Sequence, residues 1–204
     1  MSTISSEAIS AGASPPGATD RFPELSVDNM TAAQKNVAES IVSGPRKDLR
    51  GPFNAWLRSP ELADRLQKVG EYLRFGSSLP PRLNEFAILI VAREWTAQFE
   101  WFAHYPLAIK GGLDPNVAAD LAAGRRPQGM QEDERVIYDF CTELRRERGV
   151  SDATFGAALE KIGEQGIVDL IGVSGYYDIV SMTLNVAQVR LPPGEKTPLS
   201  ALKK

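Results

Sequence analysis

The sequence predicts an all-α protein built as a bundle of helices. Its apolar residues recur at three- and four-residue steps over several long segments, which is the period of an amphipathic helix. No segment reads as a convincing strand, because the apolar runs are too long and the turn signals between them too sparse. With 204 residues, of which 43% are hydrophobic, the chain is long enough for one domain with a sizeable core.

The composition divides the chain into three parts. Residues 1–22 are rich in Ser, Ala, Gly, Thr and Pro and have little to bury, so we expect a flexible N-terminal arm. Residues 23–190 carry the helical pattern and form the expected single domain. Residues 191–204 are polar and interrupted by prolines, which predicts a C-terminal tail.

Three helices are expected in the first half of that domain. Residues 31–42 form the first, which Ser43-Gly44-Pro45 stops. An irregular Arg50-Gly51-Pro52-Phe53 segment leads to a second helix over 60–75, with proline at its first position and apolar residues at helical spacing. The third, 82–93, is apolar around most of its circumference, which is typical of a helix buried in a bundle or an interface.

The second half continues the helical pattern. A helix runs from after Trp95-Thr96 to Lys110, with a kink or restart expected at Pro106. A short helix follows Asp114-Pro115. Residues 131–148 form an amphipathic helix with acids early and bases late, which matches the helix dipole. Two last helices are expected over 152–162 and 167–189.

Bulk properties exclude several classes of function. The net charge is −3 and the basic residues are scattered, so we expect no nucleic-acid partner. No apolar run approaches the roughly 20 residues of a membrane span, and the N-terminus lacks the features of a secretory signal. Cys141 is the only cysteine, so no internal disulfide is possible. We expect a cytoplasmic protein with no membrane partner.

One histidine stands among acids and aromatics. His104 is the only histidine in the chain, and Glu100 lies four residues before it, on the same face of the expected helix. An antiparallel hairpin turning at Trp95-Thr96 would bring Glu85 to the same place. Neighbouring carboxylates stabilise a charged imidazole, so the three residues are candidates for acid–base catalysis.

Other interpretations of these residues stay open. His104 could be a core residue whose pairing with Glu100 only stabilises the helix. A metal site made of Glu85, Glu100 and His104 would have a single imidazole ligand, which is unusual for zinc or iron. We therefore expect no metal and no cofactor. Cys141 lies inside a helical pattern, where a buried inert thiol is the usual state.

The same residues resemble a known family. The stretch with Glu85, then Glu100-Trp101-Phe102-Ala103-His104, then Gly112-Leu113 resembles the carboxymuconolactone decarboxylase family, which includes the alkylhydroperoxidase-D-type proteins. The likeness runs from about Gly51-Pro52-Phe53 and Ser59-Pro60-Glu61-Leu62 to Gly175-Tyr176-Tyr177 and Asn185. The peroxidase branch has a Cys-x-x-Cys pair between its glutamate and histidine. Here the two cysteine positions are Ala97 and Glu100, so thiol peroxidase chemistry is not expected.

The resemblance implies an all-helical fold, assembly into trimers or hexamers, and a lyase acting on a small carboxylated lactone or oxo-acid from aromatic catabolism. In this interpretation His104 donates a proton, Glu100 orients it, and Glu85 is a second acid, base or water-positioning group. Arg50 and Arg93 are the candidates to bind the substrate carboxylate, and Phe53 and Trp101 to wall the site.

Two alternatives remain. The same three residues could activate water in a hydrolase, or move a proton in an isomerase, acting on a ring-opened aromatic fragment. The chain could also be a non-catalytic helical oligomer that binds a small ligand, with His104 in a structural role.

Overall fold

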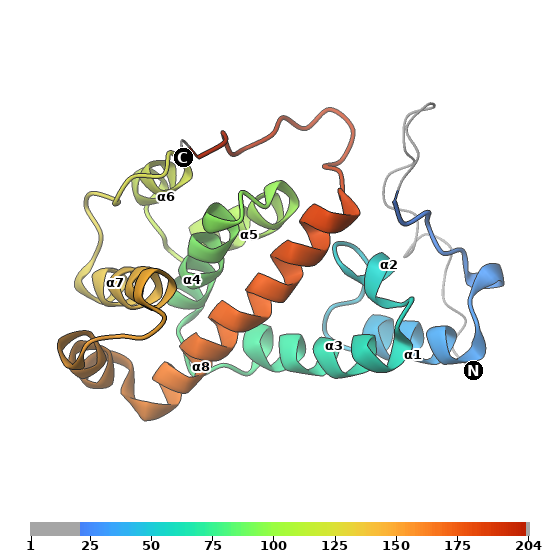
Figure 1. Cartoon of the computed structure of the whole chain (residues 1–204), viewed down its shortest axis with the longest axis horizontal. Helices are drawn as coiled ribbons and strands as arrows, with labels where there is room; N and C mark the ends of the chain where they lie inside the picture. Colours follow the sequence, from blue (N-terminus) through green and yellow to red (C-terminus); the bar gives the residue numbers. More distant parts are fainter. Residues whose placement is uncertain (1–20, 203–204) are drawn as a thin grey trace.

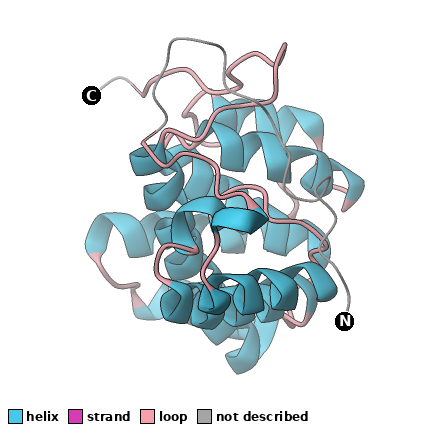
Figure 2. Ribbon diagram, turned by 90° about the vertical axis from the view of Figure 1, so that its right-hand side faces the viewer, coloured by secondary structure: helices cyan, strands magenta, loops and turns pink. Residues whose placement is uncertain are grey.

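All regular structure in residues 21–202, the part of the chain that the computed structural model describes, is helical (Figures 1 and 2). A short 3₁₀ helix at Val27–Asn29 precedes eight α-helices: α1 Ala32–Ser43, α2 Phe53–Trp56, α3 Pro60–Phe75, α4 Pro81–Glu94, α5 Gln98–Lys110, α6 Pro115–Ala122, α7 Glu132–Glu147 and α8 Asp152–Ala187. The all-α prediction is therefore confirmed over this range. Nearly all of the expected N-terminal arm, residues 1–20, lies outside the described residues.

Helix α4 is the centre of the fold. Every residue from Leu83 to Arg93 is buried, and the helix packs against α5, α7 and α8 and also touches α6 (Figure 1). A helix with apolar residues on most sides is stable in water only when other helices surround it. Helices α5 to α8 therefore surround α4, whereas α1 and α2 pack on α3, which packs on α8.

A tight turn joins α4 to α5. The backbone N–H of Ala97 donates to the carbonyl of Ala92 at 2.8 Å, and that of Trp95 to Val91 at 3.1 Å. Thr96 has a positive φ of 49° in the middle of this turn. The two helices consequently fold back on each other and pack along their lengths, as the sequence predicted. Helix α5 runs through Pro106 without a second helix being started there.

Helix α8 is broken near its start. The sequence predicted two helices here. The structure has two helical segments within Asp152–Ala187 that meet at a kink, because the backbone of Gly163 is not helical (φ 68°, ψ 178°). This conformation is one that residues with a Cβ rarely adopt, so glycine is needed at the break. Figure 1 shows α8 changing direction between its first part and its long diagonal segment.

By length and composition, α8 meets the criteria of a membrane-spanning helix. In this respect the expectation that no apolar run approaches such a span is wrong. Of the apolar segment concerned, 56% is buried inside the protein, and the core helix of a soluble protein meets the same criteria. Its burial comes from packing mainly against α4 and α7, and also against α3 and α5.

The C-terminal tail is attached to the body of the protein. After α8 it runs back over α5 towards α6 (Figure 1). The side chain of Gln98 bonds the backbone of Leu199 twice, donating to its carbonyl at 2.7 Å and accepting from its N–H at 2.9 Å. The side chain of Leu199 joins the core. The polar composition of this tail did not indicate that Leu199 is buried.

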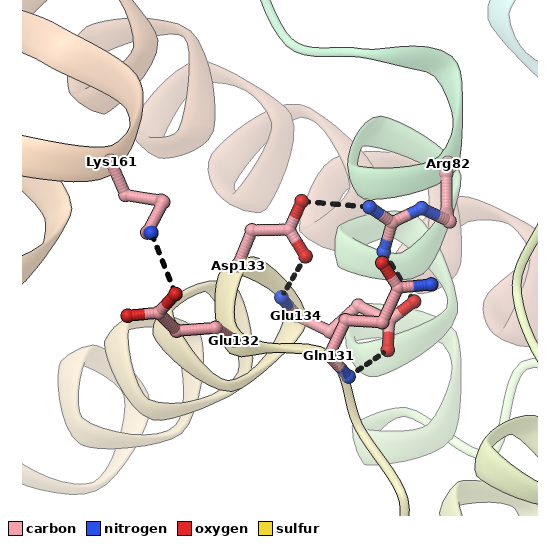
Figure 3. Close-up of polar contacts among 6 residues, drawn as sticks. All are labelled: Arg82, Gln131, Glu132, Asp133, Glu134 and Lys161. Atoms are coloured by element: carbon pink, nitrogen blue, oxygen red, sulfur yellow. Dashed lines mark hydrogen bonds and ion pairs between the residues drawn. The ribbon is translucent and has the colours of Figure 1, made fainter.

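An arginine at the start of α4 connects it to the start of α7 (Figure 3). Arg82 donates to Asp133 at 2.7 Å and also to Glu134, whose side chain is only 1% exposed. Glu134 in addition accepts from the backbone N–H of Gln131 at 2.7 Å and so completes a capping box. Burial raises the pKa of Asp133, but the hydrogen bond and charge of Arg82 outweigh it and hold that pKa below its ordinary value.

We expect Arg82→Gln to lower the free energy of unfolding by about 3 to 5 kcal/mol, because it leaves Glu134 as a buried charge without a cation. Urea denaturation at neutral pH measures this change. Arg65→Gln is the matched control: Arg65 pairs with Glu61 at the surface, with a side chain that is 73% exposed, and should cost only about 0 to 1 kcal/mol. Equal losses in the two variants would contradict this role of Arg82.

Candidate active site

The imidazole of His104 is held between two carboxyl groups. Its Nδ1 lies 2.6 Å from Oε2 of Glu85, and its Nε2 lies 2.9 Å from Oε1 of Glu100. Glu100 and His104 are one turn apart on α5, and Glu85 reaches the ring from α4 across the hairpin. All three residues are at most 8% exposed. The structure therefore brings the three predicted catalytic residues into direct contact.

Helix α8 closes the site with two tyrosines. The ring of Tyr177 meets the ring of His104 edge to face at a centroid distance of 5.2 Å, and Tyr176 meets Tyr177 in the same way. Burial raises the pKa of Tyr176 to about 12 and that of Tyr177 well above its ordinary value. Both phenols are therefore neutral near pH 7.

The imidazole is protonated at neutral pH. Burial lowers the pKa of His104, but the charges of Glu100 and Glu85 and their hydrogen bonds outweigh burial and raise that pKa from 6.5 to about 9. An imidazolium donates from both nitrogens, which suits an acid on each side. His104 thus stores a proton that it can release towards either carboxyl group.

A cavity of about 460 Å³ opens beside this triad. Glu100 and His104 belong to its wall, whereas Glu85 does not and lies behind the imidazole. The rest of the wall comes from the loop between α1 and α2, the end of α3, and parts of α5 and α8: Pro45, Arg46, Asp48, Arg50, Gly51, Pro52, Arg74, Phe75, Phe99, Phe102, Ala103, Pro106, Leu107, Tyr176, Tyr177 and Val180. The space is large enough for a small organic ligand.

Only one of the four predicted substrate-binding residues lines this cavity. Arg50 does, but its side chain is 63% exposed and bound to Asp48 at 2.7 Å. Phe53 is buried in the core, where its ring lies under the guanidinium of Arg46. We therefore keep Arg50 only as a residue of the cavity rim.

Arg93 and Trp101 point elsewhere. Arg93 donates to the carbonyl of Ser200 at 2.8 Å and to that of Ala122 at 3.1 Å, so its charge fastens the C-terminal tail to α4 and α6. Trp101 lies on α5 stacked on Tyr105, and it is buried outside the cavity wall. Neither residue enters the site proposed below.

The structure adds residues to the site that the sequence did not single out as site residues, although Tyr176 and Tyr177 lie within the resemblance. Arg46, Arg74, Tyr176 and Tyr177 come from three separate segments and meet only in the folded chain. One local signal existed. Gly70 lies inside helix α3, against helix propensity, and a Cβ there would be 2.1 Å from the hydroxyl of Tyr176.

The sequence also raised a metal site and a reactive thiol at Cys141. Between residues 21 and 202, no group of His, Cys, Asp and Glu side chains is arranged to hold a metal ion. The thiol of Cys141 is buried, 3.8 Å from the hydroxyl of Ser174, and burial raises its pKa to about 11. Such a thiol is not nucleophilic near pH 7.

No family model matches this sequence, and no curated protein matches it. The function proposed below therefore depends on the geometry of the site and on the resemblance of its residues.

The raised pKa of His104 predicts a pH-dependent stability. Because the folded-state pKa of about 9 lies above the ordinary 6.5, the stabilisation is complete below pH 6.5 and is lost as the pH rises through about 9. The shift corresponds to a free energy on the order of 3 kcal/mol.

Urea denaturation of the wild type and His104→Asn at several pH values measures this effect. Between about pH 6 and pH 9.5 the wild type should lose more stability than the variant, which has no imidazole to titrate. Parallel pH curves for the two proteins would show that the ring is not held as a cation.

Proposed function

We propose that this protein is an acid–base enzyme of the carboxymuconolactone decarboxylase type, a lyase acting on a small carboxylated lactone or oxo-acid. The observation that carries the proposal is the contact of His104 with Glu85 and Glu100 at the wall of a cavity. A buried proton store beside a space for a ligand is an arrangement suited to proton transfer.

The resemblance of the site residues supports the same activity. Glu85, Glu100 and His104 occupy positions of the family pattern, and all three meet in the fold. Ala97 and Glu100 stand where the peroxidase branch has cysteines. The proposed chemistry therefore uses carboxyl groups and an imidazole, with no thiol.

The positions of the three groups give each a role. Glu85 lies behind the ring at Nδ1, where it fixes the orientation of the imidazole and its charge. Glu100 bonds Nε2 and also faces the cavity. In our proposal the proton moves from Nε2 of His104 to the ligand directly, or through the carboxyl of Glu100. This assigns Glu85 an orienting role in preference to direct contact with the substrate.

The proposed reaction balances without a co-reactant other than a proton. The bond between the carboxylate carbon and its neighbour breaks, and CO₂ leaves. The electron pair stays on the substrate, delocalised over a conjugated carbonyl. The proton from His104 then forms the new C–H bond, and solvent restores the imidazolium. The phenyl rings of Phe99 and Phe102 line the cavity beside His104, and an apolar surrounding favours loss of the charged group.

A hydrolase or isomerase using the same residues remains the alternative, and the products distinguish it. Decarboxylation releases CO₂, hydrolysis adds the mass of water, and isomerisation leaves the mass unchanged. A non-catalytic binding protein would change none of the compounds it binds.

We expect Glu85→Gln, Glu100→Gln and His104→Asn each to lower kcat/KM by about 10²- to 10⁴-fold, because His104 and Glu100 transfer the proton and Glu85 holds the imidazole in its charged form. Carboxylated lactones and oxo-acids are screened first with the wild type by mass spectrometry. Glu61→Gln is the control, since the side chain of Glu61 is 82% exposed on α3.

For a protonated His104 as the acid, kcat/KM falls as the pH rises through about 9. Unchanged turnover in the His104 variant would refute the mechanism.

We also propose that the chain self-associates, as the resemblance implies. One face of α8 carries exposed residues at three- and four-residue steps: Val168, Ile171, Gly175, Ile179, Met182 and Val186. Large apolar side chains in such a row are typical of a face that another helix covers. A second copy provides an identical row, and Gly175 at its middle lets the two backbones approach closely.

We expect Val168→Asp and Val186→Asp to shift the oligomer towards the monomer, because each buries a charge in the interface. Size-exclusion chromatography with light scattering measures the mass. These side chains are 67% and 59% exposed in the single chain, so its unfolding should change by no more than about 0.5 kcal/mol. Asn36→Asp on α1 is the control. A wild type that is monomeric at every concentration would contradict the proposal.

A further inference from the structure

Two arginines in the cavity wall have no carboxylate partner. Arg46 lies over the ring of Phe53 at 5.0 Å and donates weakly to the hydroxyl of Tyr176 at 3.4 Å. Arg74 lies over the ring of Phe75 at 5.2 Å. Within residues 21–202, neither guanidinium forms an ion pair. Most other arginines of the same range are bound to an acid.

The two guanidinium groups belong to one end of the cavity. Gly70 and Arg74 are one turn apart on the same face of α3. A Cβ on Gly70 would lie 2.6 Å from Nη2 of Arg46, so this guanidinium rests directly on α3, one turn before Arg74. Tyr176 lies against the same glycine, and the charges of Arg46, Glu100 and Arg74 all act on its hydroxyl.

The charges of the wall are unbalanced. Four cations line the cavity: Arg46, Arg50, Arg74 and His104. The carboxyl groups in contact with these cations are already used, since Asp48 binds Arg50 and both Glu100 and Glu85 bind His104, so the surplus comes from Arg46 and Arg74. A partly buried cation is stabilised by an anion that it can hydrogen-bond, and a guanidinium matches the planar shape of a carboxylate. The surplus charge therefore favours an anionic ligand.

We propose that Arg46 and Arg74 bind a carboxylate of the substrate that the reaction retains, and so direct the reacting part of the carbon skeleton along the cavity towards Glu100 and His104. This inference rests on the proposed function and replaces Arg50 and Arg93 as the carboxylate-binding residues. The rest of the wall includes Phe75, Phe99 and Phe102, which suit an apolar body attached to the anionic group. The two arginines are specificity-determining residues and take no part in proton transfer.

Isothermal titration calorimetry tests this proposal without knowledge of the true substrate. The probes are adipate and phenylacetate, each compared with its neutral methyl ester, and inorganic phosphate. The wild type should bind at least one of the two carboxylates more tightly than its ester. Arg46→Gln and Arg74→Gln should each weaken that binding by about tenfold or more, because a charge-assisted hydrogen bond is lost.

Two control variants complete the experiment. Arg65→Gln changes an exposed arginine of the same helix α3 and should leave probe binding within about twofold of the wild type. Glu85→Gln disables the proposed proton transfer but leaves both arginines in place, so it should retain probe binding. Thermal unfolding of each variant shows whether it is folded.

The outcomes separate this inference from the proposed function. If neither carboxylate binds the wild type up to about 10 mM, if folded arginine variants bind as the wild type does, or if phosphate binds more tightly than both, the inference is wrong. If binding depends on the arginines but Glu85→Gln leaves turnover unchanged, the carboxylate site stands and the proposed mechanism fails. If turnover requires Glu85 while KM is unchanged in both arginine variants, the proposed mechanism stands and the carboxylate site at Arg46 and Arg74 is wrong.

Discussion

The site depends on the burial of an imidazolium between two carboxyl groups. Taking such groups out of water is costly unless they bind each other, and here each ring nitrogen of His104 contacts an acid. This contact requires α4 and α5 to lie antiparallel at one fixed register, because Glu85 and Glu100 come from different helices. Any sliding of one helix past the other would leave a charge without its partner.

The surrounding fold keeps that register. Helix α4 is enclosed by its neighbours, so it has no solvated face along which to move. Arg82 connects its beginning to α7, and Arg93 near its end holds the C-terminal tail. Tyr177 of α8 packs its ring against the imidazole of His104. Helix α4 is therefore held at both of its ends, and the imidazole is held by α8, which keeps the three side chains in position.

The cavity has two chemically different regions. Glu100 and His104 form a region with a hydrogen-bonded carboxyl and imidazole, and Arg46 and Arg74 form one in which two guanidinium groups have no ion-pair partner within residues 21–202. Aromatic side chains also line the cavity. A ligand held at the arginines by one anionic group would present the other end of its apolar body to Glu100 and His104, which links the proposed substrate class to the proposed reaction.

The sequence by itself determined the helical class, nearly all of the helix positions and the meeting of Glu85, Glu100 and His104 at one place. Helical periodicity and glycine or proline breaks are local properties, and Gly163 separates the last two helical segments near the place the pattern indicated. The pairing of Glu100 with His104 is equally local, since four residues make one turn. Glu85 could be placed beside them because a short turn leaves an antiparallel hairpin as the simplest path.

Only the tertiary structure decided which arginines face the cavity. Arg46 and Arg74 reach it from a loop and from α3, and their meeting point depends on how Gly70 and Tyr176 pack. Arg93 and Trp101 are close to the site in sequence, but their side chains leave their helices in other directions. The burial of Leu199 was hidden for the same reason. Contacts between segments far apart in the chain depend on how those segments pack in three dimensions. The spacing of residues along one segment carries no information about that packing.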